Sequence, residues 1–247
     1  SILYFRQGRL GQVETALTEA LSIAREIGDR RSEGSWLGNL GVLHRELGEL
    51  DRARAVYIEA LNISREFGDR RRESIDLGNL SILYLELGEL DRMETMLSEA
   101  LSIARDIGNR RLEGVLKGTQ GNLYKAQGQM SRAETAYAEA IDIARAIGDR
   151  RSEGEWLGEL GLLLMSIGRK ESAVEHLNAG EALIRELNYP LMLNKLLRNR
   201  AHAEQIATPS DIKPIEDNLS EADRAEQAKR IAEVQAILDK APTSPSR

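Results

Sequence analysis

The sequence lacks cysteine altogether, contains only five prolines, and has 4% aromatic residues among its 247 positions. Without cysteine, the protein has no disulfide, no thiolate metal site and no cysteine nucleophile, and this composition fits a reducing compartment. The sequence also has no continuous apolar run of membrane-spanning length. We therefore expect a cytoplasmic protein with no membrane partner.

A surplus of basic residues is also missing, since the formal net charge is -6 and the isoelectric point is near 5.4. Binding to nucleic acid depends on a basic face that neutralises phosphates, so we expect no nucleic-acid partner. The histidines have no recurring carboxylate or serine partner, and no phosphate-binding loop, zinc-ligand spacing or nucleophile elbow is present. We therefore expect no catalytic residue, no metal site and no cofactor, and hence no enzyme.

What the sequence does contain is a repeat of 40 residues, marked by two series of glycines. Each glycine follows a helical pattern, where it can adopt the left-handed conformation that closes a helix. The pattern predicts two helices per unit: helix A over about 31 to 47 and helix B over about 51 to 67. For helix B we expect the N-caps Gly11, Asp51, Asp91 and Ser131. The two glycine series are Gly28, Gly68, Gly108 and Gly148, and Gly8, Gly48, Gly88, Gly128 and Gly168.

Each unit also repeats an order of large apolar and small residues, and helix A has one apolar face on a helical wheel. The order comprises Leu37, Leu40, Gly41, Gly48, Ala53, Tyr57 and Ala60. It resembles the signature of the tetratricopeptide repeat (TPR) family. The forty-residue period is similar to the longer repeats of kinesin light chain, rapsyn and spindle-orientation adaptors, and to the arrays of bacterial signalling proteins. The resemblance implies an all-α fold, a right-handed α-solenoid of helical hairpins.

The chain divides into four predicted segments. Residues 1–206 form the TPR solenoid, whose first unit is truncated, because Ser1 aligns with Gly41, and whose sixth unit is divergent. A linker follows at 207–217. Residues 218–240 open with a capping-box pattern and carry a stripe of small and apolar residues, which predicts a C-terminal capping helix. The tail, 241–247, is expected to be disordered.

In the family, the face of helix A opposite the core lines a concave groove. Amides at one register match the groove asparagines that hydrogen-bond the main chain of an extended peptide, apolar side chains one turn further on would form pockets, and basic residues in the last helix would form a cationic end. Solvated polar residues of a helix face are the alternative interpretation. The predicted peptide-binding residues are Asn39, Val42, Asn79, Ile82, Asn122, Leu162, Lys195, Arg198, Asn199 and His202.

Two further patterns recur in every unit. Glycines lie inside helix A, where each costs about 0.5 to 1 kcal/mol relative to alanine. We interpret them as sites of close approach between neighbouring A helices, with backbone access for a ligand as the alternative. Arginine pairs such as Arg30 and Arg31 recur at each turn together with acidic residues, and we interpret them as structural ion pairs and caps. The internal glycines are Gly38, Gly78, Gly118 and Gly158.

The sequence thus predicts a scaffold or adaptor that binds an extended peptide or a partner segment in the groove. A second hypothesis is the regulatory or sensor arm of a larger signalling protein, an ATPase, kinase or cyclase, whose catalytic domain precedes Ser1. A third is a homodimer formed through the uncovered core face of the terminal repeat, where residues 1–7 leave an unfinished helix. A fourth is a small-peptide receptor that changes superhelical pitch on binding.

Overall fold

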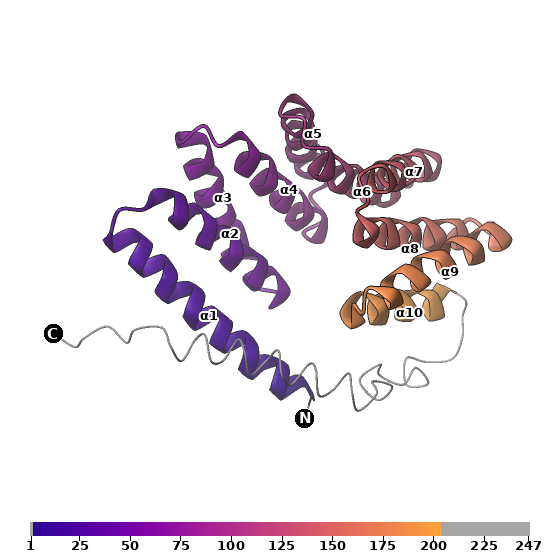
Figure 1. The fold of residues 1–247 in the computed structure, drawn as a ribbon, viewed down its shortest axis with the longest axis horizontal. Helices are drawn as coiled ribbons and strands as arrows, with labels where there is room; N and C mark the ends of the chain where they lie inside the picture. Colours follow the sequence, from indigo (N-terminus) through magenta and orange to yellow (C-terminus); the bar gives the residue numbers. More distant parts are fainter. Residues whose placement is uncertain (1, 204–247) are drawn as a thin grey trace. The chain divides into compact units, whose positions relative to one another are not determined.

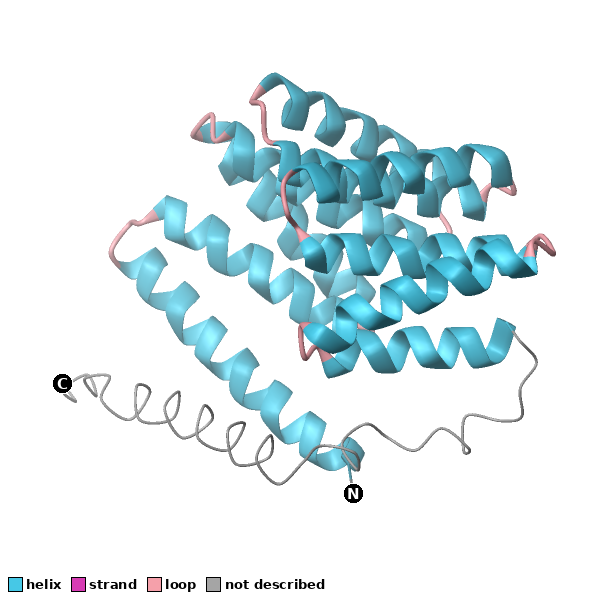
Figure 2. Cartoon of the chain, turned by 45° about the vertical axis from the view of Figure 1, so that its right-hand side comes forward, coloured by secondary structure: helices cyan, strands magenta, loops and turns pink. Residues whose placement is uncertain are grey.

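The computed structural model describes residues 2–203, and over that range it consists of ten helices joined by short turns (Figure 1, Figure 2). The predicted linker 207–217, helix 218–240 and tail 241–247 lie outside the described residues. The helices are α1 (Ile2–Glu26), α2 (Arg30–Glu46), α3 (Leu50–Glu66), α4 (Arg70–Glu86), α5 (Leu90–Asp106), α6 (Arg110–Ala126), α7 (Met130–Ala146), α8 (Arg150–Ser166), α9 (Lys170–Glu186) and α10 (Pro190–Ala203).

The chain forms two compact units, Ser1–Leu183 and Ile184–Arg247. The first contains α1 to α8 and most of α9, and the second contains the end of α9 and α10. From α1 to α8, each helix packs against the next along the chain, and the A helices α2, α4, α6 and α8 also contact one another in sequence. This succession of hairpins is an α-solenoid, as the repeat predicts, with helix boundaries one residue earlier than expected.

The turns confirm most of the glycine pattern. Eight glycines at the predicted positions, from Gly28 to Gly168, have φ between +62° and +80°, the region that glycine enters without steric cost. The prediction for Gly8 and Gly11 was wrong, because α1 runs continuously through both. The physical reason is that glycine inside a helix costs only about 0.5 to 1 kcal/mol relative to alanine, so the helical hydrogen bonds of α1 can continue through both positions.

The N-caps lie elsewhere than predicted. Each A helix from α2 to α8 is capped by the side chain before it, as where Asp69 accepts from the Arg72 backbone N–H at 2.9 Å. The B helices α3, α5 and α7 begin at Leu50, Leu90 and Met130 with no side-chain cap. The predicted caps Asp51, Asp91 and Ser131 therefore lie within the first turn. The physical reason is that the glycine turn passes directly into the helix, so that the Ala53 N–H already bonds the Glu49 carbonyl at 3.0 Å.

The core lies between the two helices of each hairpin. Tyr57 and Tyr137 are fully buried there. A Cβ atom at Gly41 would lie 2.3 Å from the Tyr57 ring, and one at Gly121 would lie 2.5 Å from Tyr137. The small residues of helix A therefore set the distance between the helices, as the sequence pattern indicated.

Candidate functional site

Five of the predicted groove residues lie on the surface of the A helices. Asn39 and Val42 are exposed on α2, and Asn79 and Ile82 are partly exposed on α4. Leu162 is partly exposed on α8. Since α2 contacts α4, these side chains belong to neighbouring helices of one continuous layer. The name A-helix face is used below for the surface that carries these five residues.

Asn122 has a structural partner that the sequence did not reveal. Its side-chain oxygen accepts a hydrogen bond of 2.6 Å from the Tyr137 hydroxyl on α7. Burial raises the pKa of Tyr137, so this hydroxyl stays protonated and acts as a donor. In the same helix Thr119 is 2% exposed. The amides of the A-helix face are therefore interrupted at α6, where Asn122 holds the hairpin together.

The basic residues predicted for the end of the groove belong to the second unit. Lys195, Arg198 and Asn199 are exposed on α10, and His202 lies in the same helix. Their participation in peptide binding stays a prediction. The histidines of the first unit bond within their own hairpin, since His44 Nδ1 lies 2.8 Å from a Glu49 oxygen and His176 Nδ1 lies 2.7 Å from the Ser172 carbonyl oxygen.

A buried polar cluster at the junction of α3 and α4 escaped the sequence analysis. The Ser64 hydroxyl donates to Asp76 Oδ2 at 2.6 Å, and Arg72 Nε lies 3.8 Å from Asp76 Oδ1. Both Arg72 Nε and Asp76 Oδ1 are buried without a hydrogen-bond partner. Burial raises the pKa of Asp76 to about 6, although the bond from Ser64 and the charge of Arg72 oppose the rise.

The signal for this cluster is departure from the repeat. Asp76 stands where the other A helices have tryptophan or leucine, at Trp36, Leu116 and Trp156. Ser64 is equivalent to Ala24, Ala104 and Ala144, and Arg72 is equivalent to Ser32, Leu112 and Ser152. A comparison of the units position by position would have singled out α4, because three polar departures meet at one point of the fold. We use the name polar cluster for Ser64, Arg72 and Asp76.

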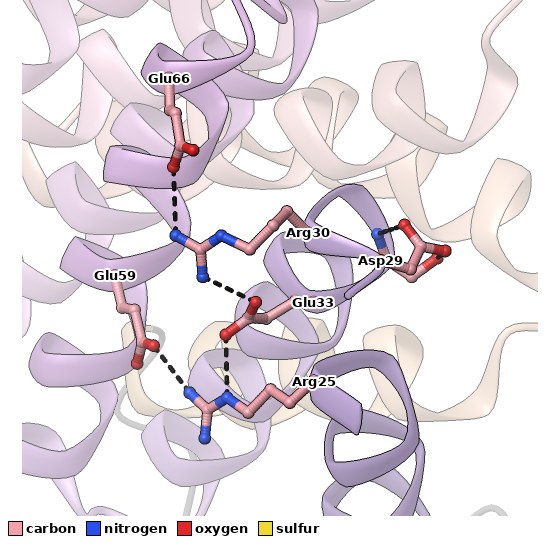
Figure 3. A network of polar contacts seen from close by, with 7 residues as sticks. Arg25, Asp29, Arg30, Glu33, Glu59 and Glu66 are labelled. Atoms are coloured by element: carbon pink, nitrogen blue, oxygen red, sulfur yellow. Dashed lines mark hydrogen bonds and ion pairs between the residues drawn. The ribbon is translucent and has the colours of Figure 1, made fainter. Parts of the chain in front are cut away.

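Ion pairs at the turns between hairpins account for the recurring arginines (Figure 3). Glu33 is 3% exposed and accepts from Arg25 Nε at 2.8 Å and Arg30 Nη1 at 2.7 Å. Burial alone would raise the pKa of Glu33, but the two arginines lower it below its ordinary value. Arg25 also reaches Glu59 on α3 at 2.7 Å. This turn is thus held by ion pairs to both helices of the next hairpin, which agrees with the structural role interpreted from the sequence.

The same arrangement recurs along the first unit. Arg65 takes the role of Arg25, because it bonds Glu73 at 2.9 Å and Glu99 at 2.7 Å. Arg105 bonds Glu113 at 3.0 Å, and Arg145 bonds Glu153 at 2.7 Å. These arginines brace the turns between hairpins through side-chain charge.

The internal glycines of the A helices make room for the next A helix. A Cβ at Gly118 would lie 2.2 Å from the Trp156 ring, and one at Gly78 would lie 3.0 Å from Leu116. At Gly38 the nearest atoms are Arg72 Nη2 at 3.4 Å and Asp76 Oδ1 at 3.5 Å. Close helix approach therefore explains Gly78 and Gly118, whereas the polar cluster leaves Gly38 with ordinary contacts.

A family model described as tetratricopeptide repeat matches residues 1–66, 32–106 and 71–146, which together cover more than half of the chain. The chain belongs to the tetratricopeptide repeat family. TPR proteins serve in general as protein-interaction scaffolds, and this chain has the helical repeat fold of that family. No curated protein sequence matches it significantly.

Solved structures with the same TPR fold include BtubC (BKLC) from P. vanneervenii, with a TM-score of 0.65 and 20% identity over 96% of this chain and 95% of that one. The Rap conjugation gene regulator of plasmid pLS20, in complex with the Phr* peptide, has a TM-score of 0.73 and 17% identity over 93% of this chain and 64% of that one. A Rap protein complexed with Competence and Sporulation Factor has a TM-score of 0.72 and 15% identity over 81% of this chain and 56% of that one. The chain thus spans less than two thirds of the two Rap proteins.

Two further findings concern the described residues. No helix among them has both the length and the apolar composition needed to cross a membrane. No group of three or more His, Asp or Glu side chains among them is arranged to hold a metal ion. Within the first unit, the predicted groove residues all lie on the layer formed by α2, α4, α6 and α8.

Proposed function

We propose that this TPR protein binds an extended peptide, or an extended segment of a partner protein, along the A-helix face. The observation that carries the proposal is the surface position of the amide and apolar pairs Asn39 with Val42 and Asn79 with Ile82 on adjacent helices. An asparagine side chain can donate to a peptide carbonyl and accept from a peptide N–H at the same time. Apolar side chains one turn away would anchor alternate side chains of the peptide.

The Rap structures support the chemistry of this proposal. Both are complexes, one with the Phr* peptide and one with Competence and Sporulation Factor. Their identity with this chain is 17% or lower, so the likeness supports a fold that can hold a peptide and leaves the peptide sequence open. Leu162 on α8 would extend the contact within the same unit.

Selection from a random peptide library displayed on phage tests the proposal. Peptides that bind the wild-type chain should lose at least about tenfold in affinity for the double variant Asn39→Ala, Asn79→Ala, because several hydrogen bonds of about 0.5 to 1.5 kcal/mol each are removed. Asn62→Ala is the matched control, since Asn62 is an exposed asparagine on the B helix α3. Equal affinity for all three proteins, measured by fluorescence polarisation, would show that binding lies elsewhere.

A further inference from the structure

The polar cluster lies beside a pocket with a volume of about 180 Å³, formed by the start of α2, the end of α3 and the start of α4. The volume is more than ten times the roughly 10 to 15 Å³ that a single water needs. Among the lining residues are Arg31, Ser35, Ser64, Phe67, Asp69, Arg71 and Arg72. Ser35 lies one helical turn before Asn39, so the pocket adjoins the A-helix face.

The wall of this pocket carries more basic than acidic side chains. Three arginines line it, against a single lining carboxylate, Asp69, which accepts the backbone N–H of Arg72 as the cap of α4. The Arg31 guanidinium lies over the Phe67 ring, 6.0 Å from its centroid. The buried Asp76 carboxylate lies behind Arg72, at 3.8 Å from its Nε, and is not in the pocket wall. The pocket wall therefore carries an excess of positive charge.

Arg71 makes no ion pair or hydrogen bond within the described structure, unlike the equivalent arginine of the next unit. One unit later, Arg111 pairs with Asp149 at 2.9 Å. Asn109 has the same position relative to Arg71 that Asp149 has relative to Arg111. Asn109 is neutral and caps α6 by accepting from the Leu112 N–H at 3.1 Å. The Arg71 guanidinium therefore has no carboxylate at the position that serves Arg111.

The fold does not need these polar residues. One repeat later the same positions hold Ala104, Leu112 and Leu116, and Leu116 is 2% exposed in a well-packed layer. Phe67 is a further departure, because the equivalent positions hold Ile27, Ile107, Ile147 and Leu187. A buried carboxylate with an unpartnered oxygen costs stability that an apolar side chain would not. Three of the four departures, Ser64, Phe67 and Arg72, line the pocket, and Asp76 lies behind Arg72. Departures that gather at one place and weaken the scaffold are typical of a binding site.

We propose that this pocket binds an oxyanion, a carboxylate or phosphate group, through Arg31, Arg71 and Arg72. The guanidinium group is planar and presents parallel N–H donors, a geometry that matches both kinds of oxyanion. Asp76 and Ser64 position Arg72 against the pocket wall. The oxyanion is either an acidic or phosphorylated side chain of the bound peptide or a free anion.

Titration with inorganic phosphate tests the site independently of any peptide. Phosphate is exchanged for chloride at constant ionic strength, and backbone amide and arginine Nε–H resonances are followed by NMR. We expect saturable shifts for Arg71, Arg72 and their neighbours. A variant that takes the residues of the next repeat, Ser64→Ala, Arg72→Leu, Asp76→Leu, should bind at least about tenfold more weakly, because the charge-assisted bonds of Arg72 are lost. Its formal net charge equals that of the wild type.

Arg71→Gln provides a second variant that changes an exposed, unpaired side chain. Its control is Arg92→Gln on α5, which removes the same charge from an exposed arginine outside the pocket that pairs with Glu89 at 2.7 Å. Weaker phosphate binding by Arg71→Gln alone supports the site. Linear, non-saturating shifts in the wild type, or equal binding by the three-residue variant, would overturn it.

Peptides from the display selection then separate the two sources of the oxyanion. Competition between phosphate and a peptide, lost when the acidic residues of the peptide are replaced by amides, assigns the oxyanion to the peptide. Simultaneous binding of both assigns the site to a free anion. If no peptide is selected, the proposed function fails while the phosphate titration still decides the site.

Discussion

Glu33 shows how a buried charge can stabilise this fold. Its carboxylate is held by Arg25 and Arg30, which themselves remain partly in water (Figure 3). The two arginines are therefore solvated while the carboxylate receives directed hydrogen bonds, and the desolvation cost falls mainly on one group. Asp76 is the opposite case, since one of its oxygens is buried without a partner.

Replacement of Glu33 by glutamine should destabilise the protein by roughly 1 to 3 kcal/mol, because both arginines lose a charged acceptor at a buried position. Chemical denaturation monitored by circular dichroism would measure the loss. Glu66→Gln is the control: Glu66 also bonds Arg30, at 3.1 Å, but its side chain is 55% exposed. That change should cost no more than about 0.5 kcal/mol. Equal effects of the two changes would contradict the role assigned to burial.

Asp76 should make stability fall as the pH rises. Its folded pKa, about 6, lies above the ordinary value of 3.8, so between these values the folded protein holds a proton that the unfolded chain has released. Stability therefore decreases from about pH 4 to pH 7, by roughly 3 kcal/mol for this group. Asp76→Asn does not titrate, so its stability relative to the wild type should increase over that range. A difference between the two proteins that is constant with pH would refute the burial of an ionisable Asp76.

The spacing of neighbouring A helices depends on which residue faces each internal glycine. Gly118→Ala should destabilise by roughly 1 to 3 kcal/mol, because the new methyl group meets the Trp156 ring. Gly38→Ala should be neutral or stabilise by up to about 1 kcal/mol, because its methyl group finds room and alanine favours helix. Thermal unfolding of both variants would measure the contrast. Trp156→Leu should restore much of the loss in Gly118→Ala, and failure to do so would point to a different cause.

Patterns that recur were predictable, and contacts that join different positions of the repeat were not. The glycine turns and the turn arginines follow from spacing, because they recur in successive units, and the buried Tyr57 has its counterpart in Tyr137. The bond from Tyr137 to Asn122 crosses from one helix to the other, so no spacing within a helix reveals it. Asp51 looked like a cap because its residue type suits one, whereas the glycine turn starts the helix earlier. The polar cluster breaks the repeat and was hidden by the search for regularity.

Within the unit of residues 1–183, each helix is stabilised by contacts with its neighbouring helices. From α1 to α8, each helix contacts the next along the chain, and each A helix contacts the next A helix. Such arrays open from their ends, where a helix has fewer partners. Amide hydrogen exchange should therefore be fastest in α1, which packs against α2, and slowest in α4 to α6, which have partners on both sides. Mass spectrometry of peptic fragments would measure the gradient. Uniform protection from α1 to α6 would indicate a single cooperative unit instead.

The arginine–glutamate ion pairs at the turns between hairpins have a consequence for how the gene can change in length. Arg25, Arg65, Arg105 and Arg145 each bond the glutamate eight residues later, so an in-frame duplication of a 40-residue stretch within this part of the array would regenerate that ion pair at the new boundary. Unequal recombination can therefore add or remove whole hairpins without new interfaces having to evolve. A duplication that included residues 64 to 76 would also copy the polar cluster, and the descendant protein would carry two buried ionisable aspartates in its array where its ancestor carried one.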